Sequence, residues 1–183
     1  MSISSTRPRS ARRLTTEVHR ELEEFLYEEA ETLDNWEFRE WLSLMAKDVH
    51  YWAPVRENRT YRERLKEQAE KGGSAYFDEN WEHLSQRVDR LYTHMAWAEE
   101  PPSRTRHLIT NIRARSTDTV DEFTVSSSFY VHRTRTERDH DWIVGKRLDV
   151  IRRVDTDLGF EIAERTVIFD VATLLNKNLS LFY

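Results

Sequence analysis

The stretch that decides the fold reads EFTVSSSFYVHRTR and runs from Glu122 to Arg135. Apolar and small residues recur at every second position and share one face: Phe123, Val125, Ser127, Phe129 and Val131. The opposite face holds the residues between them: Thr124, Ser126, Ser128, Tyr130 and His132. Because successive side chains of a strand point to opposite faces, this alternation predicts a β-strand with one buried face.

Similar strand-like runs lie on both sides of this stretch. They cover Thr105–Ser116, Trp142–Val154 and Phe160–Asp170, and they are rich in β-branched and aromatic residues. The last two are joined by Asp155–Gly159, whose residue types favour a turn. The carboxyl-terminal part of the chain is therefore predicted to form a mostly antiparallel sheet.

Helical periodicity dominates the first half of the chain. One helix is predicted after Thr16, its expected cap, with one apolar face: Val18, Leu22, Phe25, Leu26, Ala30 and Leu33. A second is predicted after Asp34, with Glu37 in a capping-box position, and its apolar face holds Phe38, Trp41, Leu42 and Met45. A third, with Asp78 as its expected cap, carries Trp81, Leu84, Val88 and Leu91.

Two further segments complete the prediction. Val49–Ala53 is predicted as a short strand that ends at Pro54, since proline cannot donate to a ladder. Asn58–Lys71 is highly charged and is predicted to be a solvated helix or a mobile loop. Helices followed by an antiparallel sheet indicate an α+β fold, with the helices lying across a curved sheet. Residues 16–183 are expected to form one domain and residues 1–15 a disordered tail.

Composition excludes several classes of protein. A net charge of -5 argues against a general nucleic-acid binder, and the absence of cysteine excludes disulfides and a thiolate-held iron–sulfur cluster within this chain. No run approaches the roughly 20 apolar residues of a membrane span.

The Ser- and Arg-rich start, Met1–Arg13, lacks the apolar core of a secretory signal. Its composition also resembles a transit peptide, but a disordered extension is the simpler interpretation, and the chain is expected to be cytoplasmic.

The sequence ends on an apolar segment, Leu179–Tyr183, which reads LSLFY. The last residues of a domain are usually polar and poorly ordered. This segment is therefore expected to be buried, either in the core of the chain or against another chain.

His107 is the main candidate for chemistry, because it begins a strand just after a double proline. It could act as a general base in a pocket enclosed by the sheet. The other residues that could reach such a pocket are Asp34, Asp48, His50 and Tyr51. The simpler interpretation, which we prefer, places His107 with Arg104 and Arg106 at a protein interface.

Histidine and tryptophan residues do not call for a bound ligand. A mononuclear oxygenase iron needs two histidines and one carboxylate. His132 and His140 are separated by a charged turn that is expected to be solvated, so no metal site is expected in this chain. Three tryptophans lie at apolar helical positions and are expected in the core: Trp36, Trp41 and Trp81. Trp52 and Trp97 lie near chain breaks, where a partner could cover them. For Trp97, a place in the core is an equally open alternative.

This order of elements resembles the cone-shaped fold of nuclear transport factor 2, ketosteroid isomerase and scytalone dehydratase. Specific segments resemble the small (beta) subunit of aromatic-ring-hydroxylating dioxygenases, from about Val18 to the last residue. They are FLYEEA (25–30), WLSLMAKDVHY (41–51), AWAEEPPSRTRH (96–107), VGKRLDVIRR (144–153) and the ending from Leu174 to Tyr183. The segment EPPSRTRH is most similar to the biphenyl, benzene and alkylbenzene branch.

The resemblance implies a subunit of an oxidoreductase that adds both atoms of dioxygen to an aromatic ring, giving a cis-dihydrodiol. Electrons would come from NADH through a reductase and a ferredoxin. A Rieske 2Fe-2S cluster and a mononuclear iron would both belong to the large (alpha) subunit. The chain would then hold no cofactor or catalytic residue, and would support the large subunit in an α3β3 hexamer with beta–beta trimer contacts.

Two other readings stay open on the sequence alone. One is a stand-alone lyase, isomerase or hydrolase of the cone-shaped fold with a His, Asp and Tyr pocket, and the other is a dimeric interaction module. Under the preferred reading the candidate interface residues are Trp97, Arg104, Arg106, His107, Leu181, Phe182 and Tyr183.

Overall fold

The computed structural model describes residues 13–93, 101–174 and 179–183. Its helices are α1 (Thr16–Asp34), α2 (Phe38–Ser43) and α3 (Trp81–Tyr92), with a 3-10 helix η1 at Tyr61–Lys66. Its strands are β1 (Met45–Pro54), β2 (Ala75–Glu79), β3 (Arg104–Ser116), β4 (Glu122–Thr134), β5 (His140–Arg153) and β6 (Phe160–Phe169). The predicted α+β class is confirmed.

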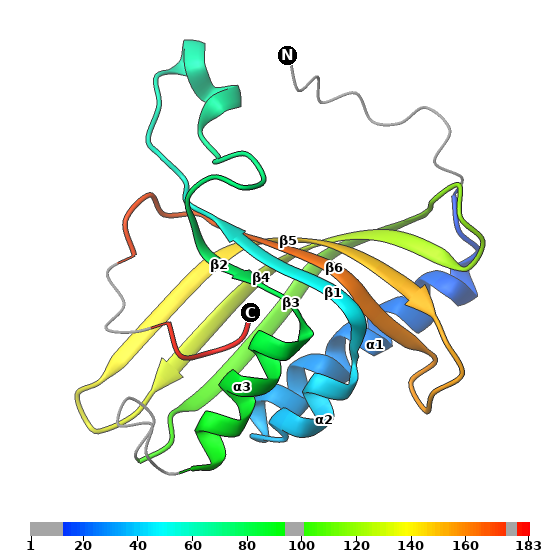
Figure 1. Ribbon diagram of the computed structural model, residues 1–183, viewed down its shortest axis with the longest axis horizontal. Coiled ribbons are helices and arrows are strands. Elements are labelled where there is room, and N and C mark those ends of the chain that lie inside the picture. The colour runs from blue at the N-terminus through cyan, green and yellow to red at the C-terminus, as the bar shows by residue number, and fades with distance from the viewer. Residues whose placement is uncertain (1–12, 94–100, 175–178) are drawn as a thin grey trace.

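The six strands form one sheet in the order β2-β1-β6-β5-β4-β3. All neighbouring strands are antiparallel except β1 and β6, which are parallel. Figure 1 shows α1, α2 and α3 gathered on one side of the curled sheet. The core therefore lies between this helix layer and the inner face of the sheet.

The alternation in Glu122–Arg135 decides which face of the sheet is buried, as predicted. Phe123, Val125, Phe129 and Val131 are each at most 6% exposed, and Ser127 is buried with them. The predicted apolar face of α1 is buried too, from Leu22 to Leu33. Four of the strands lie within two residues of their predicted bounds.

Three capping predictions are wrong. Thr15, and not Thr16, caps α1 by accepting a hydrogen bond from the Val18 amide at 3.3 Å. Asp34 is the last residue of α1, and α2 begins after Glu37 without a side-chain cap. Asn80 caps α3, because its side chain accepts from the His83 amide at 3.0 Å, while Asp78 lies in β2.

The strand predictions for the first half were also incomplete. β1 begins at Met45, which was predicted on a helix face, because this segment pairs with β6. β2 was not predicted at all; it pairs with β1 at positions such as Ala53 and Phe77. The charged stretch Asn58–Lys71 contains the short helix η1. No helix in the described part of the chain is long and apolar enough to cross a membrane.

The tryptophans divide between core and surface. Trp41 is fully buried, as predicted, whereas Trp36 is 42% exposed and has a left-handed backbone (φ 62°), so its core prediction is wrong. Trp36 follows the end of α1 and reverses the chain into α2. Trp81 is partly buried, and the ammonium of Lys47 lies 3.0 Å from the centre of its ring. Trp52 is 8% exposed within the chain itself.

Candidate functional site

The end of the chain fills the space between the helices and the sheet. Phe182 is 1% exposed, and its ring stacks on Trp41 with centroids 4.1 Å apart. Arg87 of α3 lies over the Phe182 ring as well, with its guanidinium carbon 4.4 Å from the centre of the ring. Nη2 of Arg87 donates to the Leu181 carbonyl at 2.9 Å. The predicted burial of this segment is thus inside the chain's own core.

Tyr183 lies deeper, among the aromatic residues of the sheet. Its ring meets Phe169 edge-on at 5.2 Å, and it lies near Phe129 and Phe77. The Tyr51 hydroxyl donates to the main-chain oxygen of Tyr183 at 2.6 Å and accepts from its amide at 2.8 Å. Burial raises the pKa of both tyrosine hydroxyls, so Tyr51 and Tyr183 stay neutral at ordinary pH.

A buried cluster of four charges lies next to this segment. Glu29 of α1 binds Arg165 of β6 through both carboxylate oxygens, one of them at 3.0 Å, and accepts from Arg147 of β5 at 3.0 Å. Arg165 also binds Asp149 of β5 through two hydrogen bonds of 2.9 and 3.0 Å. All four side chains are at most 2% exposed. Two carboxylates and two guanidinium groups leave the cluster neutral.

The cluster controls the protonation of Glu29. Burial alone would raise the pKa of this carboxyl, but Arg165 and Arg147 outweigh burial and lower it to about 2. Burial and the neighbouring Arg165 lower the pKa of Arg147. The pKa of Arg165 is raised because Asp149 and Glu29 outweigh its burial. The arrangement therefore favours a permanently charged, structural cluster over a proton-transfer site.

His107 is held between α1 and the end of the chain. Its Nδ1 lies 2.6 Å from a carboxylate oxygen of Asp34, and its Nε2 lies 3.2 Å from the Phe182 carbonyl. The His107 amide also donates to the same carboxylate at 3.0 Å. Burial would raise the pKa of Asp34, but the hydrogen bonds from His107 outweigh it and lower the pKa. Both ring nitrogens of His107 are thus already engaged inside the chain.

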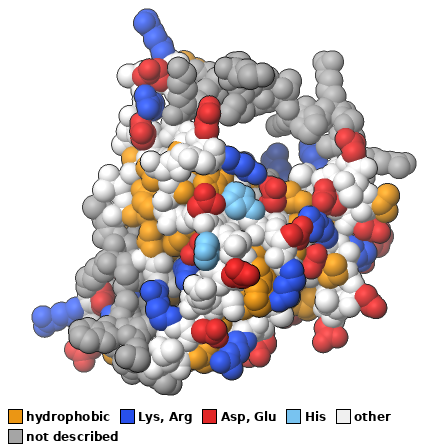
Figure 2. All heavy atoms as spheres, in the orientation of Figure 1, with side chains coloured by type: hydrophobic (Ala, Val, Ile, Leu, Met, Phe, Trp, Pro, Cys, Tyr) orange, Lys and Arg blue, Asp and Glu red, His pale blue; other side chains and the backbone are white. Residues whose placement is uncertain are grey.

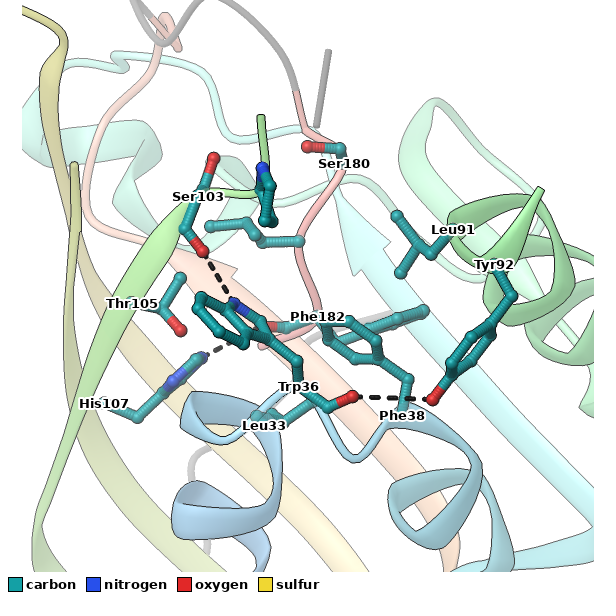
Figure 3. Close-up of a pocket in the computed structure, with 12 residues that line it drawn as sticks. Leu33, Trp36, Phe38, Leu91, Tyr92, Ser103, Thr105, His107, Ser180 and Phe182 are labelled. Atoms are coloured by element: carbon teal, nitrogen blue, oxygen red, sulfur yellow. Dashed lines mark hydrogen bonds between the residues drawn. The ribbon is translucent and has the colours of Figure 1, made fainter. Parts of the chain in front are cut away.

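A small apolar cavity of about 280 Å³ lies beside this histidine. In Figure 3, His107 and Thr105 of β3 face it from one side and Tyr92 of α3 from the other, with Trp36 and Phe182 between them. The Trp36 indole donates to the Ser103 carbonyl at 2.7 Å. Because His107 has no ring nitrogen left for a ligand, the cavity lacks a free general base at this position.

The structure brings together only part of the predicted pocket. Asp34 and His107 are in contact, and Tyr51 is buried against Tyr183. Asp48 instead pairs with Arg152 at 2.9 Å, and His50 pairs with Asp78 at 2.8 Å, both at the surface. The five residues do not form one constellation.

The predicted interface residues take different places. Arg104 and Arg106 are exposed on β3, and Arg106 lies 3.3 Å from the Asp34 carboxylate. Leu181 is partly buried, Phe182 and Tyr183 are in the core, and Trp97 lies outside the described residues. The interface role of these residues stays a prediction.

The described residues offer no group of three or more His, Asp or Glu side chains that could hold a metal ion. His132 and His140 stack at 6.3 Å on the outer face of the sheet, without a carboxylate that would complete a site. The residues in the described part of the chain therefore do not fit an iron centre.

Figure 2 shows acidic and basic side chains intermixed over one face of the molecule.

The buried charge cluster is the feature that sequence reasoning missed. Glu29 stands within the apolar face of α1, three residues after Leu26 and four after Phe25. Arg147, Asp149 and Arg165 stand at inward positions of their strands, where an apolar residue is the rule. The sequence did contain a signal for this cluster: each of these charged residues occupies a position where the periodicity of its helix or strand predicts a buried side chain.

Comparison with known proteins gives a consistent result. The profile of the family described as ring hydroxylating beta subunit matches residues 28–176. The chain is 39% identical to the beta subunit of biphenyl 2,3-dioxygenase from Rhodococcus jostii and 38% identical to that of benzene 1,2-dioxygenase from Pseudomonas putida. Each match covers 91% of this chain and 89% of the relative.

The solved structures agree on the fold. A chain of naphthalene 1,2-dioxygenase with indole bound superimposes with a TM-score of 0.81 at 24% identity, covering 93% of this chain and 88% of that one. The fold is the cone-shaped α+β fold that scytalone dehydratase-like proteins share.

Proposed function

The chain belongs to the family of ring-hydroxylating dioxygenase beta subunits, and we propose that it supports a separate large subunit without supplying catalytic groups of its own. As a beta subunit of an aromatic-ring-hydroxylating dioxygenase, it is part of an oxidoreductase complex. The proposal concerns the division of labour within that complex.

One observation carries the proposal: the last residues of the chain occupy much of the space between the helices and the sheet. Phe182 and Tyr183 occupy the interior between the helices and the sheet, and His107 is engaged at both ring nitrogens. In a catalytic protein of this shape we would expect an open interior with a titratable group facing the substrate. Here the corresponding groups hold the chain together.

We propose that the large subunit carries out the reaction of the complex. In the proposed reaction both atoms of dioxygen are added to an arene to give a cis-dihydrodiol, with electrons delivered from NADH through a reductase and a ferredoxin. The Rieske cluster and the mononuclear iron reside in the large subunit. The absence of cysteine from this chain supports this assignment, because a Rieske centre needs two cysteine ligands.

The proposed assembly is a cytoplasmic α3β3 hexamer with contacts between beta subunits. The proposed substrate is an arene of the biphenyl or benzene type, because relatives named for these substrates share 38 to 39% of residues with this chain. The substrate pocket itself would belong to the large subunit.

A stand-alone lyase, isomerase or hydrolase is the alternative. It would place the Asp34–His107 pair beside the cavity of about 280 Å³ as its catalytic group. The engagement of His107 Nε2 by the Phe182 carbonyl weighs against this reading, because the nitrogen facing the cavity would have to leave its partner first.

Reconstitution tests the proposal. The large subunit of the same organism is produced with and without this chain, and cis-dihydrodiol formation from biphenyl and benzene is measured with ferredoxin, reductase and NADH present. Turnover is expected from the two subunits together and none from this chain alone. Full, stable activity of the large subunit without this chain would contradict a supporting role, and conversion by this chain alone would contradict a non-catalytic one.

A further inference from the structure

The outer face of the sheet, opposite the helices, carries a patch of large apolar side chains. Three such residues of β3, β4 and β5 are exposed and adjoin there: Leu108 (54%), Tyr130 (36%) and Trp142 (60%). Leu148 (41%) is exposed on the same face farther along β5, beyond Lys146. Leu108 pairs with Tyr130 across the strands, and the rings of Tyr130 and Trp142 stack with centroids 6.3 Å apart. Exposed apolar residues that adjoin in this way, and are not scattered singly, mark an interaction surface.

Cations frame this patch. The strand register places six of them on the same face: Arg104, Arg106, Arg113, Arg115, Lys146 and Arg152. Glu122 is the one acidic residue among the outward positions of β3, β4 and β5, all of which are described. The chain as a whole carries a net charge of -5, so this face has the opposite sign of charge. We call these outward residues the β3–β5 face.

Most of these cations are available to a partner. Arg152 pairs with Asp48 and Glu122, and Arg106 with Asp34. The other four, Arg104, Arg113, Arg115 and Lys146, form no ion pair with any residue in the described part of the chain. Aromatic and arginine side chains are the types that most often anchor protein interfaces, and a guanidinium group pairs with a carboxylate through two parallel hydrogen bonds.

We propose that the β3–β5 face docks on the large oxygenase subunit, on a surface where apolar side chains are framed by carboxylates. The proposal rests on the proposed function, which supplies the existence of that partner. The stacked Tyr130 and Trp142 would form the dry centre of the contact and the arginines its charged rim. Charge complementarity of this kind fixes orientation and excludes wrong partners.

Neither the β3–β5 face nor the α1 surface of a second copy of this chain complements the face. Two β3–β5 faces brought together would oppose four unpaired cations to four, because Arg106 and Arg152 already pair with carboxylates of their own chain. The acidic surface of α1, which exposes Glu17, Glu24, Glu28 and Glu31, has the right charge. However, Tyr27 is the one large apolar side chain that α1 exposes, so this surface cannot cover the Leu108–Tyr130–Trp142 patch.

The test is co-purification with a tagged large subunit. The double variant Leu108→Asp/Trp142→Glu alters two side chains that are more than half exposed, so the variant is expected to fold with the wild-type unfolding midpoint. Its recovery with the large subunit is expected to fall about tenfold or more, because it buries two unpaired carboxylates in the apolar centre of the contact. The matched control, Tyr27→Glu/Leu158→Asp, adds the same charges on other surfaces and is expected to be recovered like the wild type.

A second variant, Arg113→Glu/Arg115→Glu, tests the charged rim without touching an apolar residue. It is expected to weaken recovery most at low salt, where charge attraction is least screened. Normal recovery of both folded variants overturns the proposal. So does a variant that loses only self-association of the chain, since this would assign the face to a second copy. Failure of the wild-type chain to bind the large subunit at all would overturn the proposed function itself.

Discussion

Glu29 and Arg165 form a fully buried ion pair that joins the helix layer to the sheet. Glu29 lies in α1 and Arg165 in β6, 136 residues apart in sequence, and both carboxylate oxygens bind the guanidinium group. Trp41 of α2 donates to the same carboxylate at 3.1 Å. The Glu29 carboxylate thus joins α1 to α2 through Trp41, and it joins α1 to the strands β5 and β6 through Arg147 and Arg165.

Replacing Glu29 by Gln is expected to destabilise the fold by about 3–5 kcal/mol, because it leaves two buried guanidinium groups with one carboxylate between them. Urea unfolding monitored by circular dichroism measures the change. Glu28→Gln, at the exposed neighbouring position, is the control and is expected to stay within about 0.5 kcal/mol of the wild type. Equal stability of the two variants would contradict the role given to the cluster.

Acid should weaken the fold through the same residue. The folded pKa of Glu29 is about 2, below its ordinary value of 4.5, so its ionised form stabilises the fold fully above about pH 4.5. This contribution, roughly 3 kcal/mol from the shift, is lost as the pH falls from 4.5 towards 2. Unfolding midpoints of the wild type and Glu29→Gln are therefore expected to converge over this range. A constant difference between them from pH 7 to pH 3 would argue against the shift.

Phe182 is expected to matter for stability as much as a residue of the central core. Phe182→Ala removes the ring stacked on Trp41 and should cost about 3–5 kcal/mol, as other buried Phe→Ala changes do. Leu158→Ala, in the exposed turn between β5 and β6, provides the comparison in the same urea titration. If the two substitutions cost the same, the end of the chain does not belong to the core.

His107→Ala is expected to spare turnover in an intact complex while lowering the stability of the chain. The substitution removes both ring hydrogen bonds, to Asp34 and to the Phe182 carbonyl, which should cost about 1–3 kcal/mol. The rate is measured per iron-replete complex after its subunit ratio has been checked, with His107→Gln alongside to restore a donor. Loss of turnover in such an intact complex of the alanine variant would favour a catalytic pocket around this histidine.

Local periodicity was sufficient wherever one face of an element packs on the core. The strands β3, β4, β5 and β6 were predicted close to their observed bounds, because a period of two follows directly from one buried and one exposed face. The apolar face of α1 was predicted for the same reason, at a period near 3.6. Long-range pairing decided the other elements. Met45 extends a helical pattern in sequence, yet it pairs with Ile162 in the parallel ladder between β1 and β6.

Polar residues were harder to place than apolar ones. Asp34 has the sequence signature of a helix cap, but its carboxylate accepts from His107, 73 residues later. Glu29, Asp149 and Arg165 are buried only because each finds a partner from another element, which no local pattern encodes. Burial of the apolar end of the chain could be predicted, whereas its position against Trp41 and Tyr51 required the structure.

The most direct test of the account is the composition of the complex that forms around this chain. The tagged chain is purified from the organism that produces it, and native mass spectrometry measures its partners and their ratio. We expect a larger, iron-containing subunit in equal number. Recovery of the chain alone, as a stable, colourless oligomer, would contradict the account and would direct the search for activity to the cavity beside His107.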